Sequence, residues 1–112
     1  MALDNTETAL VALKDLLGDR LSQGASVREA HGRDEAYSQP ALPDAVAFPE
    51  STEEVSRIMK ICSAHRVPVV PFGIGTSLEG HVIPIHGGIS IDTSRMNKVL
   101  EIHPSDLDAV VQ

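Results

Sequence analysis

Tryptophan is absent from this sequence, and the other aromatic residues are few, with one Tyr and two Phe. A folded core must therefore be built mainly from Val, Ile, Leu and Ala. Cysteine occurs once, at Cys62, so the chain cannot form an internal disulfide, and a cysteine-ligated zinc site would need ligands from elsewhere. Cys62 falls on the apolar stripe of an expected helix, which favours a buried, inert thiol.

Basic residues are in the minority, with nine Lys and Arg against sixteen Asp and Glu and a formal net charge of −7. Nucleic-acid binding needs a basic face, so no nucleic-acid partner is expected. No run of the sequence approaches the roughly 20 apolar residues of a membrane span, and the N-terminus lacks the features of a secretory signal or transit peptide. We expect a cytoplasmic protein without a transmembrane segment, and leave peripheral membrane contact open for a longer enzyme.

Two helices are predicted in the first third of the chain. The first has leucines at helical spacing, namely Leu10, Leu13 and Leu17. Asp4 is its expected cap and Gly18 its expected end. A second, short helix is expected over residues 26–31, with Ser26 as the cap and Glu29 as the partner in a capping box.

The clearest helix signal begins at Ser51. Glu54 follows three residues later, and a Ser cap followed by Glu at this spacing forms a capping box. Apolar residues then recur at i, i+3, i+4 and i+7 and predict one buried stripe, formed by Val55, Ile58, Met59 and Cys62. The helix is expected to end near His65 and Arg66.

Five short strands are predicted after an extended, Gly- and Pro-punctuated connector over residues 32–43. They cover residues 45–48, 67–71, 89–92, 99–102 and 109–111. The first two flank the capped helix and predict a βαβ unit with parallel strands and a right-handed crossover. The third alternates in polarity and is expected to be half-buried, and turns are expected at residues 97–98 and 104–105.

A glycine-rich loop directly follows the second predicted strand. Its candidate cofactor-binding residues are Pro71, Phe72, Gly73, Ile74, Gly75, Thr76, Ser77 and Gly80. Ligands of open α/β sheets bind at the carboxyl ends of parallel strands, and glycines let the main chain approach a ligand closely. Amide N–H groups turned inward, together with hydroxyl donors, suit a pyrophosphate. The alternative interpretation is that the glycines only shape a turn.

Two better-known phosphate motifs do not fit this loop. The Rossmann fingerprint requires a third glycine where Leu78 stands, and it must open a helix, whereas Pro84 follows shortly. The Walker loop requires Lys and then Ser or Thr after its second glycine, and the chain has His81 and Val82 there. Without that Lys, nucleoside-triphosphate chemistry is not expected.

Residues 43–112 resemble the FAD-binding domain of the vanillyl-alcohol oxidase superfamily, also called PCMH-type. The matching features are Pro43-Asp44-Ala45-Val46 with Pro49, the helix capped by Ser51, Val67-Pro68-Val69-Val70-Pro71, Gly73-Ile74-Gly75-Thr76-Ser77 with Gly80, and residues 89–103. Within that superfamily, the loop over residues 71–80 and the lead-in over residues 27–35 are most similar to the D-lactate dehydrogenase (cytochrome) and glycolate oxidase FAD-subunit group.

The resemblance implies an α+β fold, in which residues 43–112 form the first α/β lobe of the FAD-binding domain. Residues 1–42 would be an N-terminal helical extension and connector. The loop would hold the FAD pyrophosphate, non-covalently because Thr76 stands where some members carry a flavin-linking His. The whole enzyme would oxidise a D-2-hydroxy acid, of D-lactate or glycolate type, by hydride transfer to flavin. The family's catalytic and metal residues lie beyond Gln112, so neither is expected here and the chain alone should be inactive.

The chain stops inside a predicted strand, which indicates a truncated domain with an open edge. One alternative function is therefore an inactive lobe that binds little or no FAD. Another is a homodimer paired through residues 109–112. His81 and His86 lack a nearby third ligand for a metal. The remaining polar candidates are expected at the solvated surface: His31, His65, His103, Asp106 and Asp108.

Overall fold

A sheet with strand order β1-β2-β4-β3 forms the centre of the computed structural model, which describes residues 5–33, 40–76 and 81–112. Its strands are β1 (Leu21–Ser22), β2 (Ala45–Ala47), β3 (Val69–Phe72) and β4 (Ile89–Asp92). β4 pairs in parallel with both β2 and β3, and β1 pairs antiparallel with β2. The predicted βαβ unit is confirmed in order and direction, but β4 lies between its two strands.

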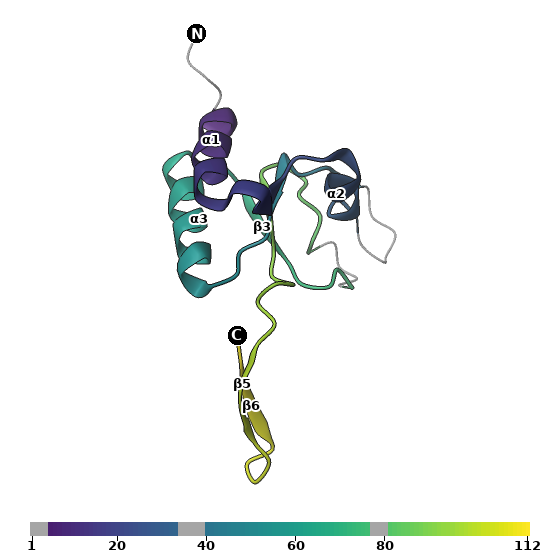
Figure 1. Ribbon diagram of the computed structural model, residues 1–112. Coiled ribbons are helices and arrows are strands. Elements are labelled where there is room, and N and C mark those ends of the chain that lie inside the picture. The colour runs from purple at the N-terminus through teal and green to yellow at the C-terminus, as the bar shows by residue number, and fades with distance from the viewer. Residues whose placement is uncertain (1–4, 34–39, 77–80) are drawn as a thin grey trace.

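Helices cover both faces of this sheet (Figure 1). α1 (Asn5–Leu17) and α3 (Thr52–Ala64) lie together on one side, and the short α2 (Ala25–Ala30) lies on the other. A single 3₁₀ turn, η1 (Gly18–Arg20), leads from α1 into β1. The buried core fills the space between the sheet and the pair formed by α1 and α3. Its members are Ala9, Leu13, Leu17, Leu21, Ala45, Ala47, Ile58, Cys62, Val67, Ile89 and Ile91.

The central strand β4 divides its side chains between two different environments. Ile89 and Ile91 face the core beneath α1 and α3. Because successive side chains of a strand point to opposite faces, Ser90 and Asp92 lie on the α2 side. All four residues are buried, so the prediction of a half-buried strand is wrong. The physical reason is position: a parallel strand with neighbours on both edges and helices on both faces has no solvated side.

The Ser51 cap is confirmed, but the reciprocal half of the predicted capping box differs, because the Glu54 carboxylate accepts from the Glu50 amide rather than from that of Ser51. The amide of Glu54 donates to Ser51 Oγ at 3.2 Å, and α3 ends at Ala64 with His65 as its C-cap, as predicted. The Glu54 carboxylate also accepts hydrogen bonds from Nη1 and Nη2 of the Arg20 guanidinium, each at 2.5 Å. This bidentate contact, together with a hydrogen bond from the Glu50 amide, lowers the pKa of Glu54 to about 2.

Four local predictions are wrong. α2 begins after Gly24 rather than at Ser26, because the Arg28 amide already donates to the Gly24 carbonyl and places Ser26 inside the first turn. Met59, predicted on the buried stripe of α3, is exposed, and Ile61, two residues later, packs against the core instead. The predicted strand at residues 67–71 begins two residues late.

That delay has a clear cause, because the Val67 amide still donates to Cys62 of α3 and Pro68 has no amide proton to give. The fourth error concerns residues 97–98, where no turn forms. The turn lies instead at residues 94–95, closed by the Met96 amide donating to the Thr93 carbonyl. The expected Asp4 cap lies outside the described residues.

The last two strands, β5 (Val99–His103) and β6 (Asp108–Val111), form a separate antiparallel hairpin. Figure 1 shows the hairpin projecting from the body, which gives the molecule extents of 61 × 34 × 22 Å. Both strands and the turn near residues 104–105 are confirmed. The hairpin exposes large apolar side chains, with Ile102 68% and Leu107 93% accessible. A two-stranded hairpin with such exposure has little packing of its own to stabilise it.

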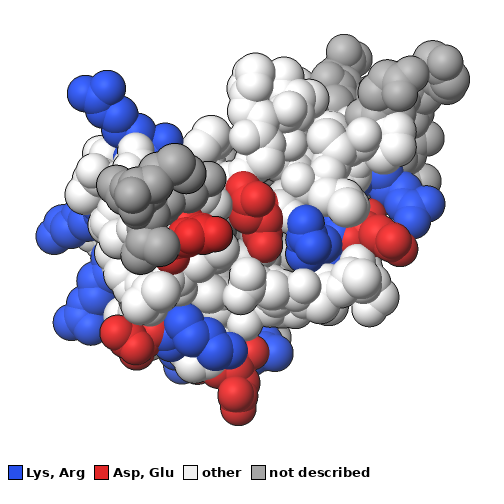
Figure 2. Space-filling view, turned by 90° about the horizontal axis from the view of Figure 1, so that it is seen from above, with Lys and Arg blue, Asp and Glu red and all other residues white. Residues whose placement is uncertain are grey.

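The surface shows no large region of one charge in the view of Figure 2, where basic and acidic side chains alternate. None of the helices in the described ranges has the length and apolar character needed to cross a membrane.

Candidate functional site

The glycine-rich loop leaves the carboxyl end of β3, at the same edge of the sheet as the end of β4. Pro71 and Phe72 are the last two residues of β3, opposite Ile91 and Asp92 in the parallel register. The Phe72 carbonyl accepts a hydrogen bond from the Thr93 amide at 3.0 Å, so the two strand ends are tied together. The predicted position of the loop, at the carboxyl end of a parallel strand, is confirmed.

Gly75 is required by the local backbone. Its φ is +78°, in the left-handed region that L side chains rarely adopt. A Cβ built at this position would stand 2.4 Å from the Phe72 ring, so the ring occupies the space beside the glycine. The turn and the aromatic side chain that precedes it therefore depend on one another.

Gly73 has a different environment. Its φ is not in the left-handed region, and a Cβ added there would meet no described atom within 4 Å. Neither backbone strain nor internal packing accounts for a glycine at this position. An approaching ligand would account for it, because a residue without Cβ lets a phosphate come close to the main chain.

The loop offers neutral hydrogen-bond donors. Within the described part of the chain, no backbone carbonyl accepts from the amides of residues 73–76. Ile74 is 84% exposed, so this segment lies at the surface rather than in the core. Residues 71–76 carry no charged side chain, and Thr76 adds a hydroxyl donor. Such an arrangement can bind an anionic group through main-chain donors. Ser77 and Gly80, which complete the predicted set, lie outside the described residues.

A buried His–Asp pair beneath the loop was missed by the sequence analysis. His31, expected at the surface, is only 7% exposed, and its Nε2 lies 2.7 Å from Asp92 Oδ2. Burial alone would raise the pKa of Asp92, but hydrogen bonds from His31 and Ser94 outweigh it and hold that pKa below its usual value. The Phe72 ring lies against the imidazole, with 4.2 Å between ring centroids. The partners are 61 residues apart, so no spacing in the sequence indicates the pair.

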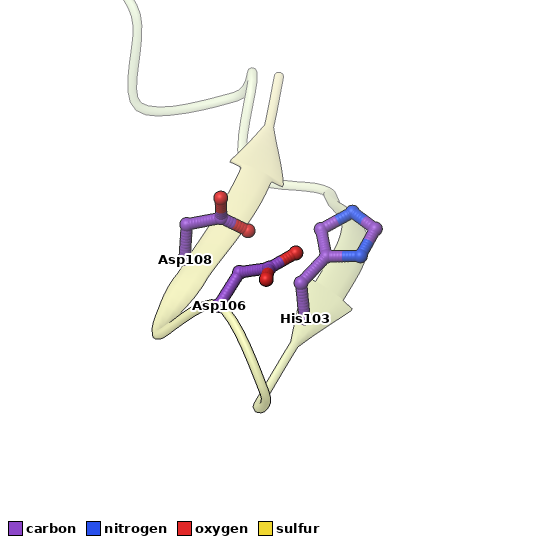
Figure 3. A group of neighbouring side chains, drawn as sticks. All are labelled: His103, Asp106 and Asp108. Carbon is purple, nitrogen blue, oxygen red and sulfur yellow. The ribbon is translucent and has the colours of Figure 1, made fainter.

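A second cluster lies at the tip of the β5–β6 hairpin. His103, Asp106 and Asp108 each point a ligand atom toward the same space, with these atoms within 4.8 Å of one another (Figure 3). The His103 side chain is 42% exposed and its Nε2 already lies 2.9 Å from Glu101 Oε2. The two aspartates are exposed, as predicted. Exposed polar groups around a turn are common without a metal, so this geometry alone indicates no metal site.

One surface hollow in the described part of the chain is not formed by the glycine-rich loop. It has a volume of about 360 Å³ and is lined by residues of α2 and the connector, namely Glu29, Gly32, Arg33, Pro40, Ala41 and Leu42. No loop residue contributes to it. Cys62 also offers no site, because its thiol is buried in the core and burial raises its pKa to about 11.

Comparison with known proteins gives one family match. The model of the family described as FAD binding domain matches residues 43–112. A probable mitochondrial D-lactate dehydrogenase of Danio rerio is 42% identical over 107 residues, which cover 95% of this chain and 22% of that protein. The glycolate oxidase subunit GlcD of Bacillus subtilis is 45% identical over 85 residues, 76% of this chain and 18% of the relative. The chain thus spans about a fifth of the length of these relatives.

Solved structures show the same fold. An alkyldihydroxyacetonephosphate synthase structure superposes with a TM-score of 0.83 at 27% identity, over 95% of this chain and 22% of that one. A p-cresol methylhydroxylase structure superposes with a TM-score of 0.79 at 23% identity, over 93% of this chain and 21% of that one. The mixed helix and sheet architecture expected from the sequence is confirmed by these likenesses.

Proposed function

The chain belongs to the FAD binding domain family, and from that premise we propose that the loop after β3 contacts the pyrophosphate of FAD. The proposed contacts are Pro71, Phe72, Gly73, Ile74, Gly75, Thr76, Ser77 and Gly80. The observation that carries the proposal is the open space beside Gly73 at the end of a parallel strand, where no described backbone carbonyl accepts from the amides of residues 73–76. Residues 43–112 would be the lobe that supplies these donors, after an extension of residues 1–42.

For the whole protein, we propose oxidation of a D-2-hydroxy acid of D-lactate or glycolate type. The names of the similar D-lactate dehydrogenases and of the glycolate oxidase subunit support this substrate class. FAD, when bound, would supply the acceptor for the substrate hydride. The part of this chain would be to position the cofactor by its pyrophosphate. Neutral main-chain donors at the loop would hold the anion without a competing charged side chain.

Non-covalent FAD binding belongs to the same proposal, because Thr76 offers no nucleophilic imidazole for a flavin link. The expected cytoplasmic compartment stays a prediction, since several similar proteins are named as mitochondrial.

A visible spectrum and calorimetric titrations with FAD and ADP test the proposed site in the purified chain. Both ligands share the pyrophosphate, so saturable binding of both is the expected result. Binding of neither would refute the pyrophosphate site in this chain and favour the inactive-lobe alternative.

The exposed hairpin favours a second candidate, in which two copies pair through β5 and β6. Ile102 and Leu107 are largely accessible there, and Val111 is 63% exposed at the end of β6. Exposed apolar strands are prone to pairing with another chain. Size-exclusion chromatography at two concentrations separates the cases: a monomer at both removes the pairing hypothesis, and a dimer that grows with concentration supports it.

A further inference from the structure

His31 is held by two hydrogen-bond partners at once. Its Nδ1 lies 2.8 Å from the Val27 carbonyl oxygen, and its Nε2 lies 2.7 Å from Asp92 Oδ2. Asp92 is held in turn, because its other oxygen accepts from the Ser94 amide at 2.8 Å. Both ring nitrogens of the buried His31 therefore have a fixed partner.

This His–Asp pair lies against Phe72, the last residue of β3 before the glycine-rich loop. The Phe72 ring is tilted by 46° against the imidazole, and the Phe48 ring meets the imidazole edge-on at 5.9 Å. The Phe72 ring also fills the space where a Cβ on Gly75 would lie. A continuous series of contacts thus runs from Asp92 through His31 and Phe72 to the turn at Gly75. These contacts join the end of α2, where His31 lies, to the glycine-rich loop.

We propose that His31 is a positioning residue for the glycine-rich loop after β3. Its imidazole ring, fixed between Val27 and Asp92, sets the position of the Phe72 ring, and that ring sets the turn whose amides would meet the pyrophosphate. The inference rests on the proposed function for its consequence on FAD affinity, but the effect on the loop conformation stands independently of any ligand. A substitution at His31 should therefore change residues 73–76 without touching them.

His65 provides a matched control. It is the C-cap of α3, as His31 is the C-cap of α2, and its Nδ1 also lies 2.8 Å from the carbonyl oxygen four residues earlier, that of Ile61. A role limited to capping a helix would give His31→Gln and His65→Gln the same consequences. The carboxylate and the aromatic contact distinguish His31, so only its replacement should alter the loop.

The experiment compares His31→Gln, Asp92→Asn and His65→Gln in the 112-residue chain. Backbone amide shifts of residues 73–76 are measured by NMR without ligand, FAD affinity by calorimetry, and the melting temperature of each variant beside them. We expect His31→Gln and Asp92→Asn to move the loop amides and weaken FAD binding by about tenfold, while His65→Gln does neither.

Loop amides that stay in place in His31→Gln and Asp92→Asn would overturn the inference. The same conclusion follows if the three variants lose FAD affinity only in proportion to their melting temperatures. Should His31→Gln fail to fold, the loop amide shifts of the near-isosteric Asp92→Asn variant test the inference in its place. A parent chain that binds no FAD would refute the proposed function alone, and the loop amide shifts would still decide whether His31 positions the loop.

Discussion

Gly73→Ala separates a contact with the ligand from a requirement of the fold. The added methyl group would meet no described atom within 4 Å, and the backbone at Gly73 is outside the left-handed region. The substitution therefore strains nothing in the described protein. A methyl group there would, however, stand in the path of a phosphate that approaches the main chain.

Gly73→Ala should raise the stability of the fold and lower the affinity for FAD. Replacing Gly by Ala at a compatible position stabilises a protein by about 0.4 to 1 kcal/mol, because the unfolded chain loses freedom. Affinity for FAD should fall by at least about tenfold, or about 1.4 kcal/mol, because the amides can no longer reach the pyrophosphate at hydrogen-bond distance. If the variant is slightly more stable yet binds FAD more weakly, the affinity is lost through a blocked contact with the ligand and not through damage to the fold.

Calorimetric titration with FAD and with ADP measures the affinity, and urea unfolding measures the stability. Gly75→Val is the comparison variant. Its backbone would need a φ of +78°, and its side chain would collide with the Phe72 ring. We expect it to lose flavin binding with the fold largely intact, because the turn is at the surface. The reasoning fails if Gly73→Ala binds both ligands as tightly as the parent protein does.

Three further predictions concern the body of the fold. Glu54→Gln should destabilise the protein by about 1 kcal/mol at neutral pH, because water partly screens the Arg20–Glu54 pair. The pKa of Glu54 is lowered from 4.5 to about 2, so this stabilisation is full above about pH 4.5 and is lost as the pH falls toward 2. Urea midpoints that depend on pH identically in parent and variant would contradict it. Gly88→Ala should destabilise by about 3 kcal/mol or more, because φ is +86° and a Cβ would lie 2.1 Å from the Pro68 carbonyl oxygen; an unchanged urea midpoint would refute this. Cys62 should react with a thiol reagent at pH 8 only as the protein unfolds, since burial raises its pKa to about 11, and rapid labelling of the native protein would show the thiol to be accessible.

Local signals in the sequence were sufficient for most of the elements. The Ser51 cap fixes the start of α3, because Ser51 and the Glu54 amide that it accepts from are three residues apart and need no tertiary contact. Gly18 ends α1 for a similarly local reason, since it adopts a φ of +58°. The loop after β3 could also be placed, because glycines follow an apolar run directly. Periodicity and short-range chemistry are properties of the sequence itself.

Contacts between distant segments could not be predicted in this way. The insertion of β4 between β2 and β3 is a choice of topology, and nothing in the 89–92 sequence indicates which edges it pairs with. β1 has only two residues, which is too short to give a period. The pair formed by Arg20 and Glu54 spans 34 positions, and each partner alone looks like an ordinary surface charge. Such residues become functional or structural only when the chain has folded.

The proposed phosphate site illustrates how these two kinds of information combine. The protein carries a formal net charge of −7, so its overall field opposes an anionic ligand. An uncharged loop can still bind a pyrophosphate, because amide dipoles act at hydrogen-bond distance and their effect depends on orientation rather than on net charge. Orientation is what a short glycine-rich segment cannot maintain by itself. It must come from what lies beneath, here the tie between Thr93 and Phe72 and the buried pair of His31 and Asp92. The donors are therefore local in sequence, whereas the rigidity that would make them selective comes from three separate segments of the chain.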